Sequence, residues 1–195
     1  VTQSRDFYLP STAVIAQDKL GLPQDCMAFD IGLGCSGYTY GLSVAASIMK
    51  STGIKKALLL VGDVSTVTCA YNDTSTYPLF GDAGTATLLE LSEGNQWSFD
   101  LHSDGSGEEA IKIPHGGMRH LLTEESLIER KREDGNTRSD LHLQLDGLSV
   151  FNFSITKVPK SLNSFLDEIN ADRELIDFFV MHQANKLMNE TIRKK

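Results

Sequence analysis

The chain has 195 residues, of which 41% are hydrophobic and 23% are charged, so it can bury a core and is not disordered. Its 18 basic and 26 acidic residues give a net charge of -8, which argues against a general nucleic-acid-binding protein. No apolar run approaches the roughly 20 residues of a membrane-spanning helix, so we expect no membrane span.

Hydrophobic periodicity in the first half of the chain predicts helices that alternate with strands. The expected elements are a helix at 10–21, a strand at 27–31, a helix at 35–49, and strands at 57–61 and 85–91. Gly37, Gly41 and Ala45 recur every four residues in the second helix. This stripe of small residues permits close backbone approach, so we expect that helix to be central and buried.

The second half of the chain is predicted to begin near residue 95, which gives parts of two half-domains at 1–94 and 95–195. The expected elements are a strand at 97–101 after the turn Glu93-Gly94-Asn95, a charged loop at 123–140, a helix at 148–169, a strand at 177–181 and a helix at 184–195. Pro159 lacks an amide donor and should kink the long helix. The alternation indicates an α/β protein with mostly parallel or mixed sheets.

Cys35 is the first candidate for chemistry, in the run Gly32-Leu33-Gly34-Cys35-Ser36-Gly37. A strand is expected to end there, the glycines make a tight turn, and Cys35 opens a helix. The positive potential and free amides of a helix N-terminus favour a thiolate, and the Cys35 amide could form half of an oxyanion hole. The alternative is a small buried hydrophobic residue, which is the better interpretation for Cys26 and Cys69.

The same three cysteines bear on the compartment of the protein. They are odd in number and lack the CxxC spacing of a zinc or redox site, which favours a reduced, cytoplasmic setting. The chain opens on Val1 rather than Met and shows no secretory signal, so we expect it to come from the interior of a longer protein.

His182 is the second candidate, because it follows an apolar run at the point where α/β proteins place functional residues. A hydrogen-bonded structural histidine is the alternative. The remaining histidines lie in polar segments without helical ligand spacing, so we expect no metal site. The glycine-rich segment 80–84 lacks the lysine and helix of a P-loop, which favours a tight turn in which Phe80 lines a pocket or joins the core.

Six short motifs, taken together and in order, resemble the β-ketoacyl-acyl-carrier-protein synthase III family over nearly the whole chain. They are Ala28-Phe29-Asp30-Ile31, Cys35-Ser36-Gly37, Val61-Gly62-Asp63, Phe80-Gly81-Asp82, Asp146-Gly147-x-x-Val150-Phe151 and His182-Gln183-Ala184-Asn185. The resemblance implies an α/β, thiolase-like layered α/β/α/β/α fold of two similar halves, here incomplete at both ends. It also implies a homodimer and no tightly bound cofactor.

The resemblance implies a decarboxylative Claisen condensation in fatty-acid or polyketide biosynthesis. Cys35 would take an acyl group from its substrate acyl-CoA, and His182 would be one of two residues that bind the thioester carbonyl of malonyl-acyl-carrier protein. Further roles are implied for Gly147, Phe151 and Asn185 in the pantetheine channel, for Phe80 and Leu9 in the acyl pocket, and for Lys194 and Lys195 in docking the acidic carrier protein.

Several positions depart from the family pattern. The family's catalytic Asn follows the His-Gln-Ala-Asn motif and would lie beyond Lys195; residues 135–137 resemble it but precede His182, so we reject them. Thr74 stands where many members have an arginine that clamps the coenzyme A adenine, and Asn152 replaces a frequent basic residue. Both changes leave room for an unusual acyl donor.

Two other functions remain open at this point. An acyltransferase of the same fold would move the Cys35-bound acyl group to an oxygen or nitrogen acceptor without condensation. An inactive relative would only bind or scaffold, because a fold by itself does not determine function.

Overall fold

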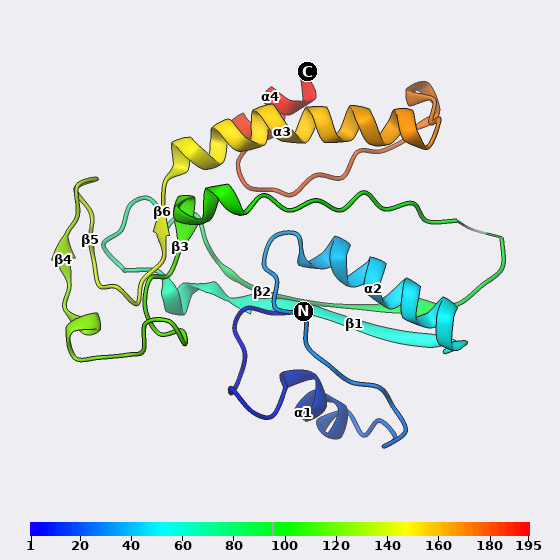
Figure 1. Cartoon of the computed structure of the whole chain (residues 1–195), viewed down its shortest axis with the longest axis horizontal. Helices are drawn as coiled ribbons and strands as arrows, with labels where there is room; N and C mark the ends of the chain where they lie inside the picture. Colours follow the sequence, from blue (N-terminus) through cyan, green and yellow to red (C-terminus); the bar gives the residue numbers. More distant parts are fainter. Residues whose placement is uncertain (95) are drawn as a thin grey trace. The chain divides into compact units, whose positions relative to one another are not determined.

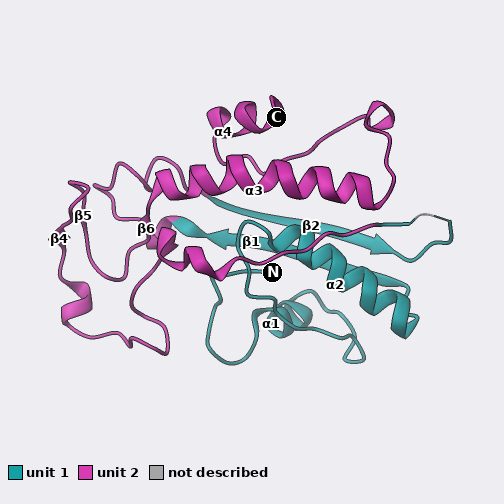
Figure 2. Cartoon of the chain, turned by 45° about the horizontal axis from the view of Figure 1, so that its top comes forward, with its two compact units in different colours: residues 1–65, 82–97 teal, residues 66–81, 98–195 magenta. Residues whose placement is uncertain are grey.

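The computed structural model describes residues 1–94 and 96–195 of the chain. Its internal contacts separate two units, of which unit 1 comprises residues 1–65 and 82–97, and unit 2 comprises residues 66–81 and 98–195 (Figure 2). The boundary predicted between residues 94 and 95 separates two structurally similar halves of a fold, whereas these units are defined by internal contacts. The predicted boundary therefore stays a prediction. Asn95 of the predicted turn lies outside the described residues.

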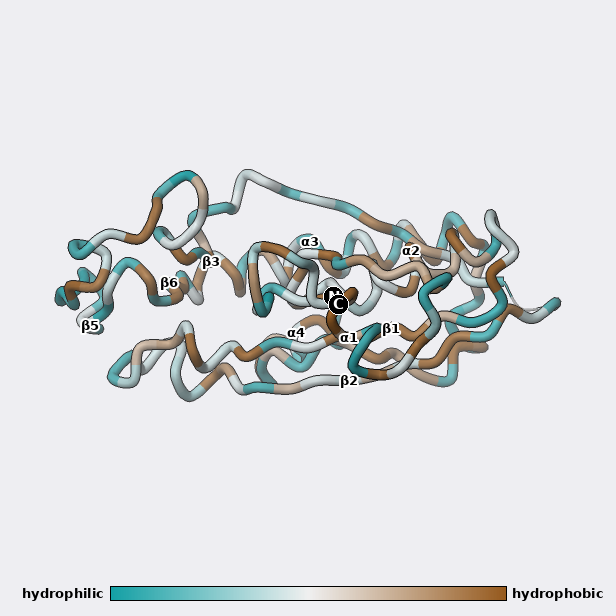
Figure 3. Tube along the Cα trace, turned by 90° about the horizontal axis from the view of Figure 1, so that it is seen from below, coloured by the Kyte–Doolittle hydropathy of each residue, from teal (hydrophilic) through white to brown (hydrophobic). Residues whose placement is uncertain are grey.

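Unit 1 is built on two long strands, β1 (Lys56–Val64) and β2 (Asp82–Glu90). They pair antiparallel in a continuous register that runs from Lys56 opposite Glu90 to Val64 opposite Asp82. Both strands are confirmed where the apolar runs predicted them, and Figure 3 colours much of β1 as hydrophobic. The glycine-rich segment 80–84 was expected to form a tight turn before the strand, but β2 already begins at Asp82.

The described ladders differ from the predicted parallel or mixed sheets, since all of them are antiparallel. A parallel pair needs a crossover connection, usually a helix. The segment between β1 and β2 contains only the short 3-10 helix η1 (Ser65–Thr68), so β2 returns beside β1 in the opposite direction.

Helix α2 (Gly37–Thr52) packs against β1 in unit 1 (Figure 1). A Cβ atom on Gly41 would lie 2.8 Å from Leu59 Cδ1, and one on Gly37 would lie 2.6 Å from Val1 Cγ1, so larger side chains at either position would clash. The predicted close approach is thereby confirmed. Burial is narrower than expected, because only Gly37, Gly41 and Met49 of the helix are buried.

Helix α1 (Thr12–Lys19) confirms the first predicted helix and explains a second departure. The Asp30 carboxylate accepts the Thr12 amide at 2.7 Å and the Ala13 amide at 2.8 Å, which satisfies two free donors at the helix start. The strand expected at 27–31 is not formed. The Thr2 amide donates to the Ile31 carbonyl at 3.1 Å, but a single backbone hydrogen bond to another segment does not make a β-ladder.

Unit 2 contains the 22-residue helix α3 (Gly147–Glu168) and the shorter α4 (Lys186–Arg193), which packs on it. The Asp146 carboxylate caps α3 by accepting the amides of Leu148 and Ser149. Both helices confirm the predicted ones, with α4 starting two residues later. The helix continues through Pro159, so the expected kink does not interrupt it.

The rest of unit 2 consists of short elements. They are η2 (Gly105–Ala110), β3 (Ile111–Lys112) paired with β6 (Gln144–Leu145), η3 (Glu125–Leu127), β4 (Arg130–Lys131) paired with β5 (Thr137–Arg138), and η4 (Arg173–Leu175). The region 123–140, expected to be a solvated loop, therefore holds a hairpin. Its Ser126, Arg138 and Ser139 are buried because polar partners surround them.

The predictions of strands at 97–101 and 177–181 are wrong, because neither segment forms a strand in the structure. Both segments run without a ladder. In the later one, Phe178 is 84% exposed and Val180 is 95% exposed, so no described element covers them. An apolar run becomes a strand only where another strand supplies hydrogen bonds.

Candidate active site

Cys35 lies in the turn that precedes α2, with its thiol exposed. The Gly37 amide donates to the Gly34 carbonyl at 2.8 Å and closes this turn. A Cβ atom at position 34 would meet the amide group of Gln3, which is the flexible end of a side chain and can move aside. The helix begins at Gly37, two residues after Cys35 rather than at it, so the thiol lies just outside the first helical turn.

The other two cysteines differ from Cys35 in their surroundings. Cys69 is 7% exposed, as expected for a small core residue. Cys26 is exposed, against expectation, because it sits in a surface turn closed by its own amide donating to the Pro23 carbonyl at 3.1 Å. Of the three thiols, only that of Cys35 is both exposed and adjacent to a helix start.

His182 follows the unpaired apolar segment 177–181 in unit 2, and its side chain is exposed. Asn189 Nδ2 of α4 donates to the His182 carbonyl at 3.1 Å. Asn185 caps α4, since its Oδ1 accepts the Met188 amide at 2.7 Å. The histidine backbone is thus tied to the first turns of α4, while Cys35 belongs to unit 1 and is fixed only within that unit.

The expected pantetheine-channel residues all lie in unit 2. Gly147 is the first residue of α3, and a Cβ there would meet no atom within 4 Å. Phe151, one turn further along, is half-buried. The Oδ1 atom of the third, Asn185, is occupied by the cap of α4. Their roles toward coenzyme A stay predictions.

The expected acyl-pocket residues are divided between the units. Leu9 of unit 1 is 85% exposed, and Phe80 of unit 2 is half-buried, with its amide donating to the Thr76 carbonyl at 3.1 Å. Their roles in an acyl pocket stay predictions. Lys194 and Lys195, the expected docking residues, are both exposed just past α4, and Lys195 Nζ donates to the Ile155 carbonyl of α3 at 2.7 Å.

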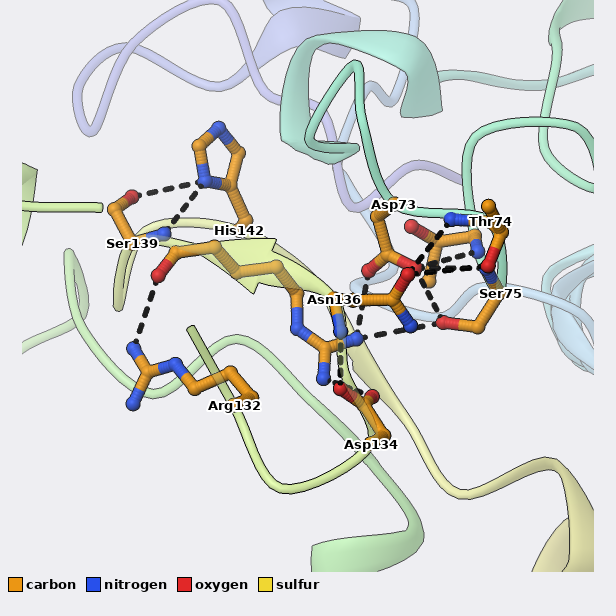
Figure 4. Close-up of polar contacts among 10 residues, drawn as sticks. Asp73, Thr74, Ser75, Arg132, Asp134, Asn136, Ser139 and His142 are labelled. Carbon is orange, nitrogen blue, oxygen red and sulfur yellow. Dashed lines mark hydrogen bonds and ion pairs between the residues drawn. The ribbon is translucent and has the colours of Figure 1, made fainter. Parts of the chain in front are cut away.

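A buried ion cluster in unit 2 escaped prediction (Figure 4). Arg138 is 5% exposed and Asp73 is 1% exposed, and Arg138 Nη1 lies 2.6 Å from Asp73 Oδ2. The other guanidinium nitrogen, Nη2, pairs with Asp134. Ser75 donates to Asp73 Oδ1 from its amide at 2.7 Å and from its hydroxyl at 2.5 Å.

Burial raises the pKa of the Asp73 carboxyl, but hydrogen bonds from Ser75 and from the Arg138 guanidinium outweigh burial and hold the pKa below its usual value. For Arg138 burial lowers the pKa, and the two carboxylates raise it above the ordinary value. Both groups are therefore charged at neutral pH. The cluster joins the loop after residue 69 to the β4–β5 hairpin.

Thr74 belongs to the same contact. Its amide and its hydroxyl both donate to Asn136 Oδ1, at 3.0 and 3.1 Å. Asn136 follows Gly135, whose φ of +85° suits the hairpin turn and favours glycine. The residues rejected above as a catalytic pair therefore have a structural role, and Thr74 fastens its loop to the hairpin.

Two other histidines of unit 2 are engaged in local hydrogen bonds. His115 Nδ1 lies 2.8 Å from Ser126 Oγ, and His142 Nδ1 accepts the Ser139 amide at 3.1 Å. Across residues 1–94 and 96–195, no group of three or more histidine, cysteine, aspartate or glutamate residues is placed to hold a metal. None of the helices in that part of the chain is long and apolar enough to cross a membrane.

Comparison with known proteins gives consistent matches. A family model for 3-oxoacyl-[acyl-carrier-protein] synthase III matches residues 29–105. The beta-ketoacyl-[acyl-carrier-protein] synthase III of Escherichia coli strain K12 is 34% identical over 195 residues, which cover 99% of this chain and 56% of that protein. The Clostridioides difficile protein of the same name is 33% identical over 186 residues, covering 94% of this chain and 53% of its own length.

A crystal structure of a 3-oxoacyl-(acyl-carrier-protein) synthase III has a TM-score of 0.95 to this chain at 36% sequence identity. The match covers 99% of this chain and 58% of that one. The chain thus spans about half the length of the curated relatives it matches.

Proposed function

We propose, because this chain belongs to the 3-oxoacyl-[acyl-carrier-protein] synthase III family, that the whole protein is a condensing enzyme of fatty-acid or polyketide biosynthesis. The observation that carries the proposal is the exposed Cys35 thiol in a glycine turn directly before α2. Such a position combines access for an acyl donor with the positive end of a helix.

In the proposed first half-reaction, the Cys35 thiolate attacks the thioester carbonyl of an acyl-CoA. A carbon–sulfur bond to Cys35 forms, the bond to coenzyme A breaks, and coenzyme A leaves as a thiolate. This is covalent catalysis, which divides one difficult transfer into two easier steps. Thr74 and Asn152 depart from the usual coenzyme A-binding pattern, so the acyl donor is the least defined part of the proposal.

In the proposed second half-reaction, malonyl-acyl-carrier protein loses carbon dioxide, and the electron pair of the broken bond forms an enolate. His182 donates a hydrogen bond to the enolate oxygen, where negative charge develops. The enolate carbon then attacks the acyl group on Cys35, the new carbon–carbon bond forms, and Cys35 leaves as a thiolate. The product is a 3-oxoacyl-carrier protein.

Replacing His182 with alanine is expected to separate the two half-reactions. Acylation of Cys35 should remain, whereas condensation should fall by about 10²–10³-fold, the usual cost of removing one donor from a developing oxyanion. Intact-mass measurement follows the acyl-enzyme, and a carrier-protein product assay follows condensation. His102→Ala is the matched control, an exposed histidine of the same unit. Unchanged condensation in His182→Ala would contradict the assigned role.

The function itself is tested with the full-length protein, incubated first with an acyl-CoA series and then with malonyl-acyl-carrier protein. The proposal expects a mass adduct on Cys35 followed by a 3-oxoacyl-carrier protein. An adduct without condensation would favour transfer to an oxygen or nitrogen acceptor. No adduct with any donor would favour an inactive binding relative.

The setting of the enzyme is part of the same proposal. A reduced cytoplasm would keep the exposed thiols of Cys26 and Cys35 unpaired, as they are in this structure. We expect the full-length protein to be a homodimer that uses no tightly bound cofactor.

A further inference from the structure

Pro159 leaves one carbonyl of α3 without its normal partner. In an α-helix each carbonyl accepts from the amide four residues later. For Ile155 that residue is Pro159, which has no amide hydrogen, yet the helix runs through it and Pro159 itself is buried. The Ile155 carbonyl accepts its hydrogen bond at an exposed site, where either water or a side chain can replace the missing amide donor.

The replacement comes from residue 195. Lys195 Nζ donates to the Ile155 carbonyl at 2.7 Å, across 40 positions of sequence. Hydrogen bonds from a charged donor are stronger than those between neutral groups. The bond therefore links Lys195, which lies two residues past the end of α4, to the point where α3 lacks its own amide donor. Both residues belong to unit 2.

Helix α4 in turn holds the His182 segment. Its buried side chains are Met188 and Ile192, 6% and 8% exposed, and they lie one turn apart on one face. In the first turn of the same helix, Asn189 Nδ2 donates to the His182 carbonyl. One short helix thus connects the proline-freed carbonyl of α3 to the backbone of His182.

We propose that Lys195 is a positioning residue, which caps the Ile155 carbonyl freed by Pro159 and thereby holds α4 and the His182 backbone in place. The catalytic part of this inference rests on the proposed function, but the cap itself does not. The proposal also distinguishes Lys195 from Lys194. The family resemblance implies the same docking role for both, but the bond to Ile155 is made by Lys195.

The test uses a double-mutant cycle in the full-length protein. Lys195→Met keeps an unbranched apolar stem and removes the donor, Lys195→Arg keeps a donor, and Pro159→Ala restores the backbone amide for Ile155. Lys194→Met is the matched control. Hydrogen exchange of the amides of α4 reports the cap without any assay of activity.

Lys195→Met is expected to accelerate exchange in α4 by about tenfold, which corresponds to about 1.4 kcal/mol, while Lys195→Arg and Lys194→Met change it less than twofold. In the Pro159→Ala background the Lys195→Met effect should largely disappear, because the carbonyl regains an amide donor. Equal acceleration in both backgrounds, or none in either, would overturn the cap.

The catalytic consequence is read in the same variants. Lys195→Met should lower kcat for condensation several-fold, with the KM for malonyl-acyl-carrier protein and the acylation of Cys35 unchanged. A docking role would instead raise that KM, as in Lys194→Met, regardless of residue 159, and would overturn the positioning role. If the protein condenses nothing, the proposed function fails while the exchange data still decide the cap.

Discussion

Cys35→Ala is expected to abolish the acyl-enzyme and to reduce condensation on the order of 10⁴-fold or more, since loss of a catalytic nucleophile removes a whole covalent pathway. Intact-mass spectra of the full-length variant should show no acyl adduct after incubation with any donor that labels the wild type. Decarboxylation of the malonyl thioester is expected to survive, because His182 rather than Cys35 stabilises the enolate in the proposed mechanism.

Cys26→Ala supplies the control for Cys35→Ala. Both thiols are exposed, but that of Cys26 lies in a surface turn that leads into no helix, so its removal should leave the adduct and the rate unchanged. Condensation that persists in Cys35→Ala, or an adduct that moves to Cys26, would refute the assigned nucleophile.

The elements that were predicted correctly are those whose sequence pattern lies within the element itself. The periodic spacing of α3, the glycine stripe of α2 and the apolar run of β1 each depend on neighbours a few residues away. The thiolase-like α/β fold class is confirmed by the family's solved structure with a TM-score of 0.95. That prediction depended on ordered motifs rather than on periodicity.

The wrong predictions share one cause, which is a partner far away in the sequence. Residues 27–31 and 177–181 have strand-like composition, but composition does not supply a neighbouring ladder. The charged stretch 123–140 was predicted to be a solvated loop. That prediction missed the burial of Arg138, because its carboxylate partner is Asp73, which lies 65 residues earlier in the sequence. No local pattern links these two residues.

The candidate site shows the same limit of local sequence patterns. Cys35 and His182 stand out through the segments on either side of them, which a single sequence displays. The contact between Lys195 and Ile155, by contrast, joins residues 40 apart and could be suspected only from the amide that Pro159 lacks. Candidate catalytic residues are thus easier to name from a sequence than the long-range contacts around them.

Arg138→Ala is the substitution for which we expect the largest loss of stability. It would leave Asp73 charged and buried without its cation, and breaking one side of a buried ion pair typically costs about 3–5 kcal/mol. Equilibrium urea unfolding measures the loss. Lys56→Ala, which breaks the exposed pair with Glu90, should cost less than about 1 kcal/mol.

The paired replacement Asp73→Leu with Arg138→Met distinguishes the ion pair from simple packing. It removes both charges together, so it should be less destabilising than Arg138→Ala alone, because no buried charge is left without a partner. A double variant that is as unstable as the sum of its parts would show that the shape of the cluster, rather than its charge, stabilises the hairpin.

The pH dependence of stability supplies an independent check on the same cluster. The pKa of Asp73 is lowered in the folded protein, so its ionised form stabilises the fold above the unfolded-state value of about 4, and the contribution is lost as pH falls below that value. The difference in unfolding free energy between wild type and Asp73→Asn should therefore narrow from neutral pH toward pH 3. A difference that stays constant over this interval would mean that the carboxylate does not gain stability from Arg138 and Ser75. Because the same carboxylate closes the contact between the residue 73–76 loop and the β4–β5 hairpin, acid should loosen these two segments before it affects the β1–β2 ladder, which contains no such buried pair among its described contacts.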